Sequence, residues 1–325
     1  MQLSRIYAPI QEDLAKVESQ IKSVTEVDSP GLAELLSYIL TGGKGIRPAL
    51  TLLSGKFYHY NLDLLLPMAT AVELMHTATL VHDDAIDHSP VRRGKPTINS
   101  VWGEDKAVLL GDYLFAKAGE FAAITGNLRV IMLFAQTLQI ISSGELNQGF
   151  NAFNLGQTRD QYLERISGKT ASLFSLAGES GAILSQAPEE SIQILKEYGY
   201  NLGIAFQIVD DMLDFIGTEE EMGKPIGSDL AQGTLTLPAM LLLERYPEDN
   251  LVRELFNNRD MPEGEKQKKI KQAIELVRNS SIIDECYDIV SGYCSKACHN
   301  LNQLPDNTSR RALFELTDYI ISRRR

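Results

Sequence analysis

The absence of proline from the middle of the chain most narrows the folds that it can adopt. No proline lies between Pro96 and Pro188, and this span is rich in Ala, Leu, Glu, Gln and Lys, which favour helices. Apolar residues recur at intervals of three and four in residues 107–124 and 130–150, as they do along one face of a helix. Alternating runs rich in Val, Ile and Thr with Asn-Gly or Asp-Gly turns are absent. We therefore expect an all-α fold.

The breaks in this helical pattern are short turns rich in Gly and Pro, and none resembles a linker between domains. No internal repeat or shift in composition divides the chain. Residues 130–144 and 198–209 carry no charge, so helices there belong inside a bundle, surrounded by other helices. Residues 1–325 are therefore expected to form a single domain, built as one large helical bundle.

Composition excludes several classes of protein. Lys and Arg number 31 and Asp and Glu 43, so the formal charge of −12 argues against binding to nucleic acid or to an anionic membrane. No run of about 18 apolar residues predicts a transmembrane segment, and the first residues do not resemble a secretion signal. The three cysteines, Cys286, Cys294 and Cys298, form no disulfide framework. We expect a soluble, cytoplasmic protein.

Two Asp-rich motifs with the same spacing are the most informative feature for function. The first, LVHDDAID at 80–87, and the second, IVDDMLD at 208–214, each follow an apolar run. Their carboxylates are those of Asp83, Asp84, Asp87, Asp210, Asp211 and Asp214. On a helix, positions i and i+4 share a face about 6 Å apart, so like charges there repel. Either motif alone could be a solvated helix face, but two sets of uncompensated carboxylates beside a core would be costly.

A divalent cation would remove this repulsion. Carboxylates without Cys partners are hard oxygen ligands, which suit Mg²⁺ or Mn²⁺ better than Zn²⁺. Because Mg²⁺ completes its shell with water and phosphate oxygens, two facing Asp-rich helices would make a clamp for a diphosphate. His82 and His88 flank the first motif, where a supporting or surface role fits them better than metal ligation.

Basic residues gather in the Gly- and Pro-rich breaks. They are Lys44 and Arg47 in GGKGIRP, Arg92, Arg93 and Lys95 in PVRRGKP, and Lys224 in GKP. Gly lets the backbone approach an anion closely, and Arg grips phosphate with two N–H groups. Each loop alone is a weak signal, since GGKG lacks the Ser or Thr of a Walker motif. Together with the Asp-rich motifs, these loops indicate a site for two phosphorylated ligands, one held by metal and one by Lys and Arg.

In its motifs and their order, the chain resembles the trans-type (all-E) isoprenyl diphosphate synthases over roughly residues 20–320. GGKGIRP is similar to the family's first loop, ELMHTATLVHDDAID with PVRRGKPT to its first Asp-rich region, SGKTASLF to its Lys-Thr motif, and GIAFQIVDDMLD with GKPIGSDL to its second Asp-rich region. The resemblance implies an all-α bundle around a deep central cavity, usually as a homodimer. It also implies that an allylic diphosphate is elongated with isopentenyl diphosphate.

The resemblance assigns roles to individual residues. Asp83, Asp87 and Asp210 would bind Mg²⁺, with Asp84, Asp211 and Asp214 supporting them. The residues implied to hold isopentenyl diphosphate are Lys44, Arg47, His76 and Arg93. Those implied to hold the allylic diphosphate are Arg92, Lys169, Thr170, Gln207 and Lys224. From the sequence alone, His76 could also be a core histidine and Gln207 a contact between helices. Gly45 stands where many members carry Arg, and the tail Arg323, Arg324 and Arg325 is similar to the basic tails of some relatives.

Charge explains the chemistry that the resemblance implies. Cations around the diphosphate stabilise it as it leaves, so the allylic C–O bond ionises to a carbocation that isopentenyl diphosphate attacks. An apolar cavity would exclude water from this cation.

Residue size bears on the length of the product. Ala78 and Thr79, about one turn before Asp83, are both small, and Met75 with Val72 lies deeper. Phe115 or Phe121 on the next helix could also form the cavity floor. We expect a product of geranylgeranyl length or longer, with medium to long polyprenyl chains favoured.

Three alternatives remain open at this stage. One is the specific activity of a geranylgeranyl diphosphate synthase. A terpene cyclase would need only one diphosphate site, which leaves Lys44, Arg47 and His76 unexplained. A catalytically silent subunit of a heteromeric synthase would lose the aspartates, all of which are present.

Overall fold

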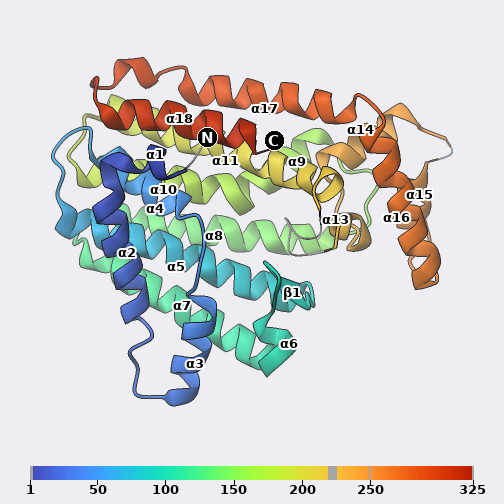
Figure 1. Ribbon diagram of the computed structural model, residues 1–325, viewed down its shortest axis with the longest axis horizontal. Helices are drawn as coiled ribbons and strands as arrows, with labels where there is room; N and C mark the ends of the chain where they lie inside the picture. The colour runs from blue at the N-terminus through green and yellow to red at the C-terminus, as the bar shows by residue number, and fades with distance from the viewer. Residues whose placement is uncertain (1–2, 219–224, 249, 324–325) are drawn as a thin grey trace.

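The computed structural model describes residues 3–218, 225–248 and 250–323, and most of these residues are helical (Figure 1). The first elements are α1 (Leu3–Ile6), the 3₁₀-helix η1 (Ala8–Ile10), α2 (Gln11–Ser23), α3 (Pro30–Ile39), α4 (Ile46–Gly55), α5 (Leu62–Ile86), β1 (Val91–Arg92), β2 (Lys95–Pro96), α6 (Ile98–Trp102) and α7 (Glu104–Ile124). They are followed by α8 (Leu128–Phe150), α9 (Arg159–Ile166), the π-helix η2 (Ser167–Ala171), α10 (Ser172–Leu184) and α11 (Glu189–Ile216). The last are α13 (Ser228–Ala231), α14 (Leu237–Arg245), α15 (Leu251–Asn257), α16 (Glu263–Arg278), α17 (Ile282–Cys298), the 3₁₀-helix η3 (Leu301–Gln303) and α18 (Thr308–Ser322). The prediction of an all-α helical bundle is confirmed, whereas the deep central cavity stays a prediction.

Helix α10 lies at the centre of the bundle, in contact with α4, α5, α8 and α11. Every residue from Leu173 to Leu184 is buried, as expected for a mainly apolar helix, and the one charged residue among them, Glu179, pairs with Lys196 at 3.1 Å. Glycines let the neighbouring backbones touch it. A Cβ at Gly178 would lie 2.3 Å from the carbonyl oxygen of Leu195 on α11, and one at Gly181 would lie 2.3 Å from that of Thr51 on α4. The central helices are therefore held at close and fixed distances.

Both Asp-rich motifs lie at the C-terminal ends of long helices. Helix α5 begins at the Asn61 cap, whose side chain accepts the N–H of Asp63, and it ends with Asp87 as its C-cap. Helix α11 ends at Ile216, two residues after Asp214. Because the C-terminus of a helix carries partial negative charge, six carboxylates there are doubly unfavourable without cations.

The loop after α5 contains a small hairpin that the sequence pattern did not predict. Strands β1 and β2 pair antiparallel, with Arg92 opposite Lys95. The turn residues Arg93 and Gly94 both have positive φ, 52° and 73°, as in the tight turns that suit two-residue hairpins. The strands are too short for alternation to reveal them, but the hairpin fixes where the two arginines of PVRRGKP lie.

Helix α5 is the one described helix that is long and apolar enough to cross a membrane. However, 61% of its most apolar window is buried inside the protein, as expected for the core helix of a bundle. Helices α1 and α18, the first and last described helices, contact each other (Figure 1), and Arg5 on α1 forms an ion pair of 3.0 Å with Glu315 on α18. The N-terminal segment is therefore packed against the last helix.

Candidate active site

The first Asp-rich motif is buried at the end of α5. Asp84 is 4% exposed, and its carboxylate accepts the Nε–H of Arg92 at 2.8 and 2.9 Å. Burial raises the pKa of Asp84, while the charge of Arg92 opposes that shift. Burial likewise raises the pKa of Asp87, against the opposing charge of Lys169. The motif therefore contains one carboxylate that is already paired with a guanidinium and others that still need positive charge.

Lys169 on the π-helix η2 supplies part of that charge. Its Nζ lies 3.3 Å from Oδ2 of Asp83 and 2.8 Å from Oε1 of Glu145 on α8. Burial alone would lower the pKa of Lys169, but Asp83 and Glu145 together raise it above its usual range. Glu145 was not predicted as a site residue. Its signal in the sequence is a lone carboxylate directly after the uncharged run 130–144.

The second Asp-rich motif is held mainly by uncharged donors. The carboxylate of Asp211 accepts the hydroxyl of Tyr162 at 2.7 Å and the amide of Gln207 at 2.8 Å, one on each oxygen. Thr170 next to Lys169 donates its hydroxyl to Gln207 Oε1 at 2.6 Å. Asp214 accepts from Ser228 Oγ at 3.0 Å and from the backbone N–H of Asp229 at 3.1 Å. Asp211 and Asp214 are thus engaged by protein donors.

Asp210 instead faces the C-terminal end of the chain. Its Oδ1 lies 2.7 Å from Nη2 of Arg323, the residue that caps α18. The guanidinium of Arg323 stacks on Phe206, with its Cζ 4.5 Å from the ring centroid. Arg47 lies 5.9 Å from the same ring and 4.6 Å from that of Phe174. Aromatic rings therefore hold both guanidinium groups, and Nε of Arg47 and Nη1 of Arg323 are buried with no acceptor in the part of the chain that is described.

The GGKG loop brings Lys44 to the same region. Gly42, Gly43 and Gly45 all have positive φ, which explains a glycine at position 45. The hydroxyl of Tyr7 donates to the carbonyl oxygen of Lys44 at 2.8 Å, so the N-terminal segment anchors this loop. A Cβ at Gly43 would lie 3.6 Å from Glu73 Oε1 and 3.8 Å from Arg93 Nη1. The loop, α5 and the hairpin therefore meet at one place.

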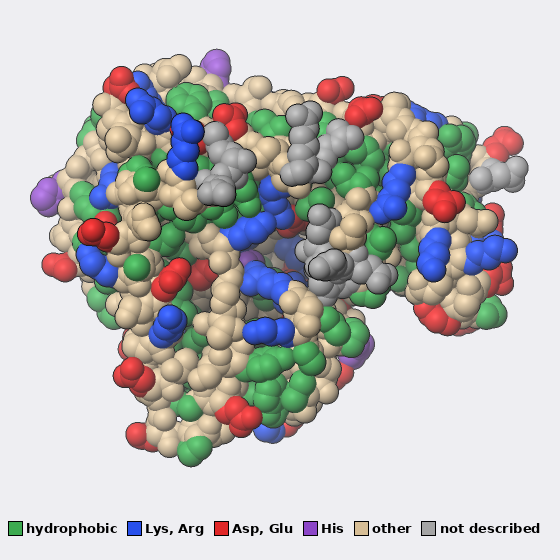
Figure 2. Space-filling model, viewed as in Figure 1, with side chains coloured by type: hydrophobic (Ala, Val, Ile, Leu, Met, Phe, Trp, Pro, Cys, Tyr) green, Lys and Arg blue, Asp and Glu red, His purple; other side chains and the backbone are tan. Residues whose placement is uncertain are grey.

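Electrostatics tie the basic residues of this place together. Burial lowers the pKa of Arg47 to about 10, which still leaves it charged at neutral pH. Burial, together with the charges of Arg47 and Arg93, lowers the pKa of His76 well below its usual value, so the imidazole is neutral. Glu73, one turn before His76, is the acidic neighbour of both arginines, and burial raises its pKa. Figure 2 shows Lys and Arg side chains around a hollow near the middle of this face.

Other predicted residues lie elsewhere or outside the described chain. Lys224, Arg324 and Arg325 lie outside the described residues. His82 bonds the carbonyl oxygen of Val108 at 2.9 Å, and His88 lies 2.7 Å from a carboxylate oxygen of Glu104, so each has a partner away from the aspartates.

The residues predicted to limit the length of the product all lie on helix α5, but they differ in how far they are exposed. Met75, Val72 and Ala78 are fully buried, whereas Thr79 is half-buried and donates its hydroxyl to the carbonyl oxygen of His76 at 2.7 Å. Phe115 packs edge-on against His82, with ring centroids 5.4 Å apart. Since His82 precedes Asp83, Phe115 lies near the aspartate end of α5, and its role in a cavity floor stays a prediction.

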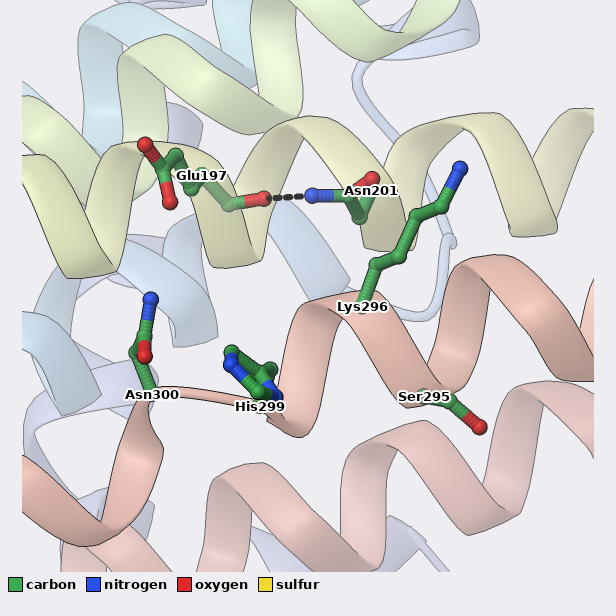
Figure 3. A pocket seen from close by; sticks show the side chains of 6 residues that line it. All are labelled: Glu197, Asn201, Ser295, Lys296, His299 and Asn300. Carbon is green, nitrogen blue, oxygen red and sulfur yellow. Dashed lines mark hydrogen bonds between the residues drawn. The ribbon is translucent and has the colours of Figure 1, made fainter.

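A polar pocket lies apart from these residues, at the C-terminal end of α17 against α11 (Figure 3). Its lining residues are Glu197, Asn201, Ser295, Lys296, His299 and Asn300. The amide of Asn201 donates to the backbone carbonyl of Glu197 at 2.8 Å. None of the residues of the Asp-rich motifs or the basic loops lines it.

The donor set fits a divalent metal that is completed by a ligand. Among the described residues, no three His, Cys, Asp or Glu side chains are grouped closely enough to hold an ion by themselves. Mg²⁺ needs no such group, since it takes one or two carboxylates and otherwise water and phosphate. Lys169 at Asp83 and Arg323 at Asp210 mark two carboxylates that a cation stabilises. Asp83, Asp87 and Asp210, the ligands that the resemblance implies, stay the predicted residues that would hold the metal, and the first and last of them already lie beside a cation.

Comparisons with known proteins agree with this geometry. The family model for Polyprenyl synthetase matches residues 29–277. The chain is 37% identical over 321 residues to heptaprenyl diphosphate synthase component 2 of Geobacillus stearothermophilus, covering 98% of both proteins. It is 36% identical to a geranylgeranyl diphosphate synthase of Saccharolobus solfataricus, covering 97% of both.

A solved structure gives the same fold. The crystal structure of a polyprenyl synthase from Caulobacter crescentus, complexed with calcium and isoprenyl diphosphate, superposes with a TM-score of 0.91 at 35% identity. The match covers 100% of this chain and 98% of that one. The chain therefore belongs to the polyprenyl synthetase family and is a prenyltransferase, a trans-prenyl diphosphate synthase that condenses isopentenyl diphosphate.

Proposed function

We propose that the chain uses Mg²⁺, or Mn²⁺ in its place, to extend an allylic diphosphate by 1′-4 condensation to an all-E product of geranylgeranyl length or longer. Medium to long polyprenyl chains are the favoured products. The observation that carries the length is the small size of Ala78 and Thr79 one turn before the aspartates. An aromatic side chain there would close the space that the growing chain needs, and neither residue supplies one. A geranylgeranyl diphosphate synthase remains the second candidate, because the same small residues permit that length.

Two separate sets of cations support two diphosphate subsites. Lys169 and Thr170 on η2, with Gln207 on α11 and Arg92, surround the aspartates and suit the allylic diphosphate. Arg47, with the neutral His76, suits isopentenyl diphosphate, since the buried Nε–H of Arg47 lacks an acceptor among the described side chains. Arg93 lies near Gly43 of the GGKG loop, and Lys44, the next residue, has its ammonium 5.9 Å from the ring centroid of Tyr319 on α18. A terpene cyclase would have no use for this second set.

The residues then act in sequence. Mg²⁺, when bound, supplies Lewis-acid stabilisation of the departing diphosphate. Lys169 and Arg92 add charge at the same oxygens, which favours ionisation of the allylic C–O bond. Arg47 and Lys44 hold isopentenyl diphosphate so that its double bond attacks the allylic cation. The new C–C bond leaves a tertiary cation, which loses a proton to the departed diphosphate and so forms the double bond of the product. Phe174 and Phe206 pack against Arg47 and help to exclude water, which would quench that cation.

We propose that the protein is a homodimer through the outer faces of α7 and α8. Apolar side chains are exposed along these two helices: Val108, Leu109, Leu128, Met132, Ile140, Leu146 and Phe150. Leu128 and Met132 lie one turn apart on α8, and α8 packs against α7, so the exposed apolar side chains lie on two neighbouring helices. A second copy would present the same patch and bury both. Sedimentation of Met132→Glu should give a monomer where the original chain gives a dimer; a monomeric original chain would overturn this proposal.

We also propose a cytoplasmic location. The three cysteines are free thiols, and burial raises the pKa of Cys286 and of Cys294 to about 12, so both stay protonated. Cell fractionation with an antibody against the chain tests this directly.

The test of product length is chromatography of the products formed with labelled isopentenyl diphosphate. Farnesyl, geranyl and dimethylallyl diphosphates would be offered in turn as starters. We expect the main product to have geranylgeranyl length or more. A product that stops at farnesyl length would contradict the proposal. Phe at Ala78 or Thr79 should shorten the product, with a larger loss of stability at the fully buried Ala78.

A further inference from the structure

Three hydrogen bonds and the backbone between residues 162 and 170 form a ring that includes part of the π-helix carrying Lys169 and Thr170. Tyr162 on α9 is fully buried and donates to Asp211 Oδ2 at 2.7 Å. Thr170 donates to Gln207 Oε1 at 2.6 Å. On α11, one turn apart, the amide of Gln207 donates to Asp211 Oδ1 at 2.8 Å and closes the ring.

The enclosed segment is an unusual piece of backbone. Residues Ser167–Ala171 form a π-helix, with the N–H of Ser172 bonded to the carbonyl of Ser167. Wide turns of this kind are rare, occur mostly as single turns, and are frequent at functional sites. Close packing surrounds this one. A Cβ at Gly203 on α11 would lie 2.6 Å from the Cα of Ala171.

We propose that Tyr162 is a positioning residue, which acts through Asp211 and Gln207 to hold the π-helix in register with α11. The ring fixes the position of η2 along the axis of α11. It thereby also fixes where the Lys169 side chain lies relative to Asp83. Tyr162 itself touches no substrate. The inference rests on the proposed role of Lys169 and Thr170 in holding the allylic diphosphate. The ring also makes Asp211 less available to a metal than Asp210, because each of its two oxygens already accepts a hydrogen bond from the protein.

The test is Tyr162→Phe, which keeps the aromatic side chain and its packing but removes the hydroxyl, and so breaks the ring of hydrogen bonds. We expect the KM for the allylic diphosphate to rise about ten-fold, because Lys169 and Thr170 would no longer be held at their binding positions. The KM for isopentenyl diphosphate should change less than two-fold, since Arg47 and His76 take no part in the ring. The matched control is Tyr198→Phe, a fully buried tyrosine on α11 whose hydroxyl donates to Leu313 at 2.7 Å. It should change neither KM.

A second readout does not depend on turnover. In hydrogen–deuterium exchange, the amides of residues 167–171 should exchange faster in Tyr162→Phe than in Tyr198→Phe. If Tyr162→Phe folds poorly, Asp211→Asn breaks the same ring from its centre and should raise the same KM. Equal changes in both KM values, or an unchanged allylic KM with unchanged exchange, would overturn the inference. A product of farnesyl length from the original chain would contradict only the proposed product length and leave this inference standing.

Discussion

The two Asp-rich motifs have the same spacing but are held in different ways. In the first, Asp84 is paired with the guanidinium of Arg92. In the second, the equivalent Asp211 is held by the uncharged donors Tyr162 and Gln207. In both motifs, however, the first aspartate faces a cation from a distant segment: Lys169 at Asp83 and Arg323 at Asp210. The two motifs therefore have the same spacing, but the aspartates within each motif differ in the partners that they contact.

The ion pairs of Asp83 and Asp210 can be exchanged for a metal ion, whereas the hydrogen bonds of Asp211 are fixed. A metal ion can replace Lys169 at Asp83 or Arg323 at Asp210 without leaving a buried N–H unsatisfied, if the ligand diphosphate then takes that cation. A metal ion that displaced the donors at Asp211 would leave the amide of Gln207 or the hydroxyl of Tyr162 without an acceptor in the core, which is costly. We therefore expect the metal to bind the first aspartate of each pair.

The largest effect is expected for Asp83→Asn. Loss of one metal ligand should lower kcat/KM by about three orders of magnitude, because several kcal/mol of stabilisation of the leaving diphosphate is lost. Steady-state kinetics at saturating Mg²⁺ measures it. Asp112→Asn, on the neighbouring α7 and 63% exposed in its side chain, is the control and should be close to the original enzyme. Unchanged turnover of Asp83→Asn would refute the metal role.

The next effect concerns stability and distinguishes the two fixed contacts. Arg92→Gln leaves the buried carboxylate of Asp84 without its cation and should lower the free energy of unfolding by about 1–3 kcal/mol, the partial exposure of Arg92 reducing the effect. Tyr162→Phe removes one hydrogen bond and should cost about 1 kcal/mol. Urea unfolding without metal gives both values. A larger loss in Tyr162→Phe would reverse the comparison.

The second motif should make the stability of the fold depend on pH. Burial, with repulsion from Asp229, raises the pKa of Asp211 to about 7. Between about pH 4 and pH 7, the folded protein then binds a proton that the unfolded chain has lost. The stability contribution of Asp211 therefore falls as pH rises through this window and is constant above it. Without metal, raising the pH from 5 to 8 should cost the original chain more stability than Asp211→Asn; equal losses would contradict the pKa.

The smallest effect is expected at the C-terminal end. Arg323→Gln removes the cation that competes for Asp210, so Mn²⁺ should bind the protein a few-fold more tightly in the absence of diphosphate. Electron paramagnetic resonance of free Mn²⁺ measures this without catalysis. Arg129→Gln, a surface pair with Glu189, is the control. Weaker Mn²⁺ binding in Arg323→Gln would mean that Arg323 does not compete with the metal.

Much of the fold followed from the sequence because helices reveal themselves over many residues. The periodicity in 107–124 and 130–150 predicts two helices, which are α7 and α8, but the uncharged run 130–144 was expected inside the bundle and is exposed along one side of α8. The hairpin around Arg93 was missed, since two-residue strands have no periodicity to detect. The site was predicted where its residues lie in short motifs, such as the two Asp-rich helices. Those motifs showed which residues gather but not what each carboxylate contacts.

The residues that were missed share one property. Glu145 and Tyr162 lie outside the motifs that the sequence analysis used, and Glu73 lies at the start of one of them without a predicted role. Tyr7 and Phe206 likewise carry no local pattern, yet one anchors the Lys44 loop and the other packs against two guanidinium groups. Such contacts depend on which helices lie side by side, which spacing along the chain does not encode.

The most direct test of the division between the two aspartates of each pair is a Mn²⁺ titration in the presence of inorganic pyrophosphate. It would compare Asp83→Asn, Asp210→Asn and Asp211→Asn, with free Mn²⁺ measured by electron paramagnetic resonance. The account predicts that the first two variants lose tightly bound Mn²⁺, whereas Asp211→Asn retains the amount bound by the original chain. Loss of bound Mn²⁺ in Asp211→Asn equal to that in Asp210→Asn would contradict it.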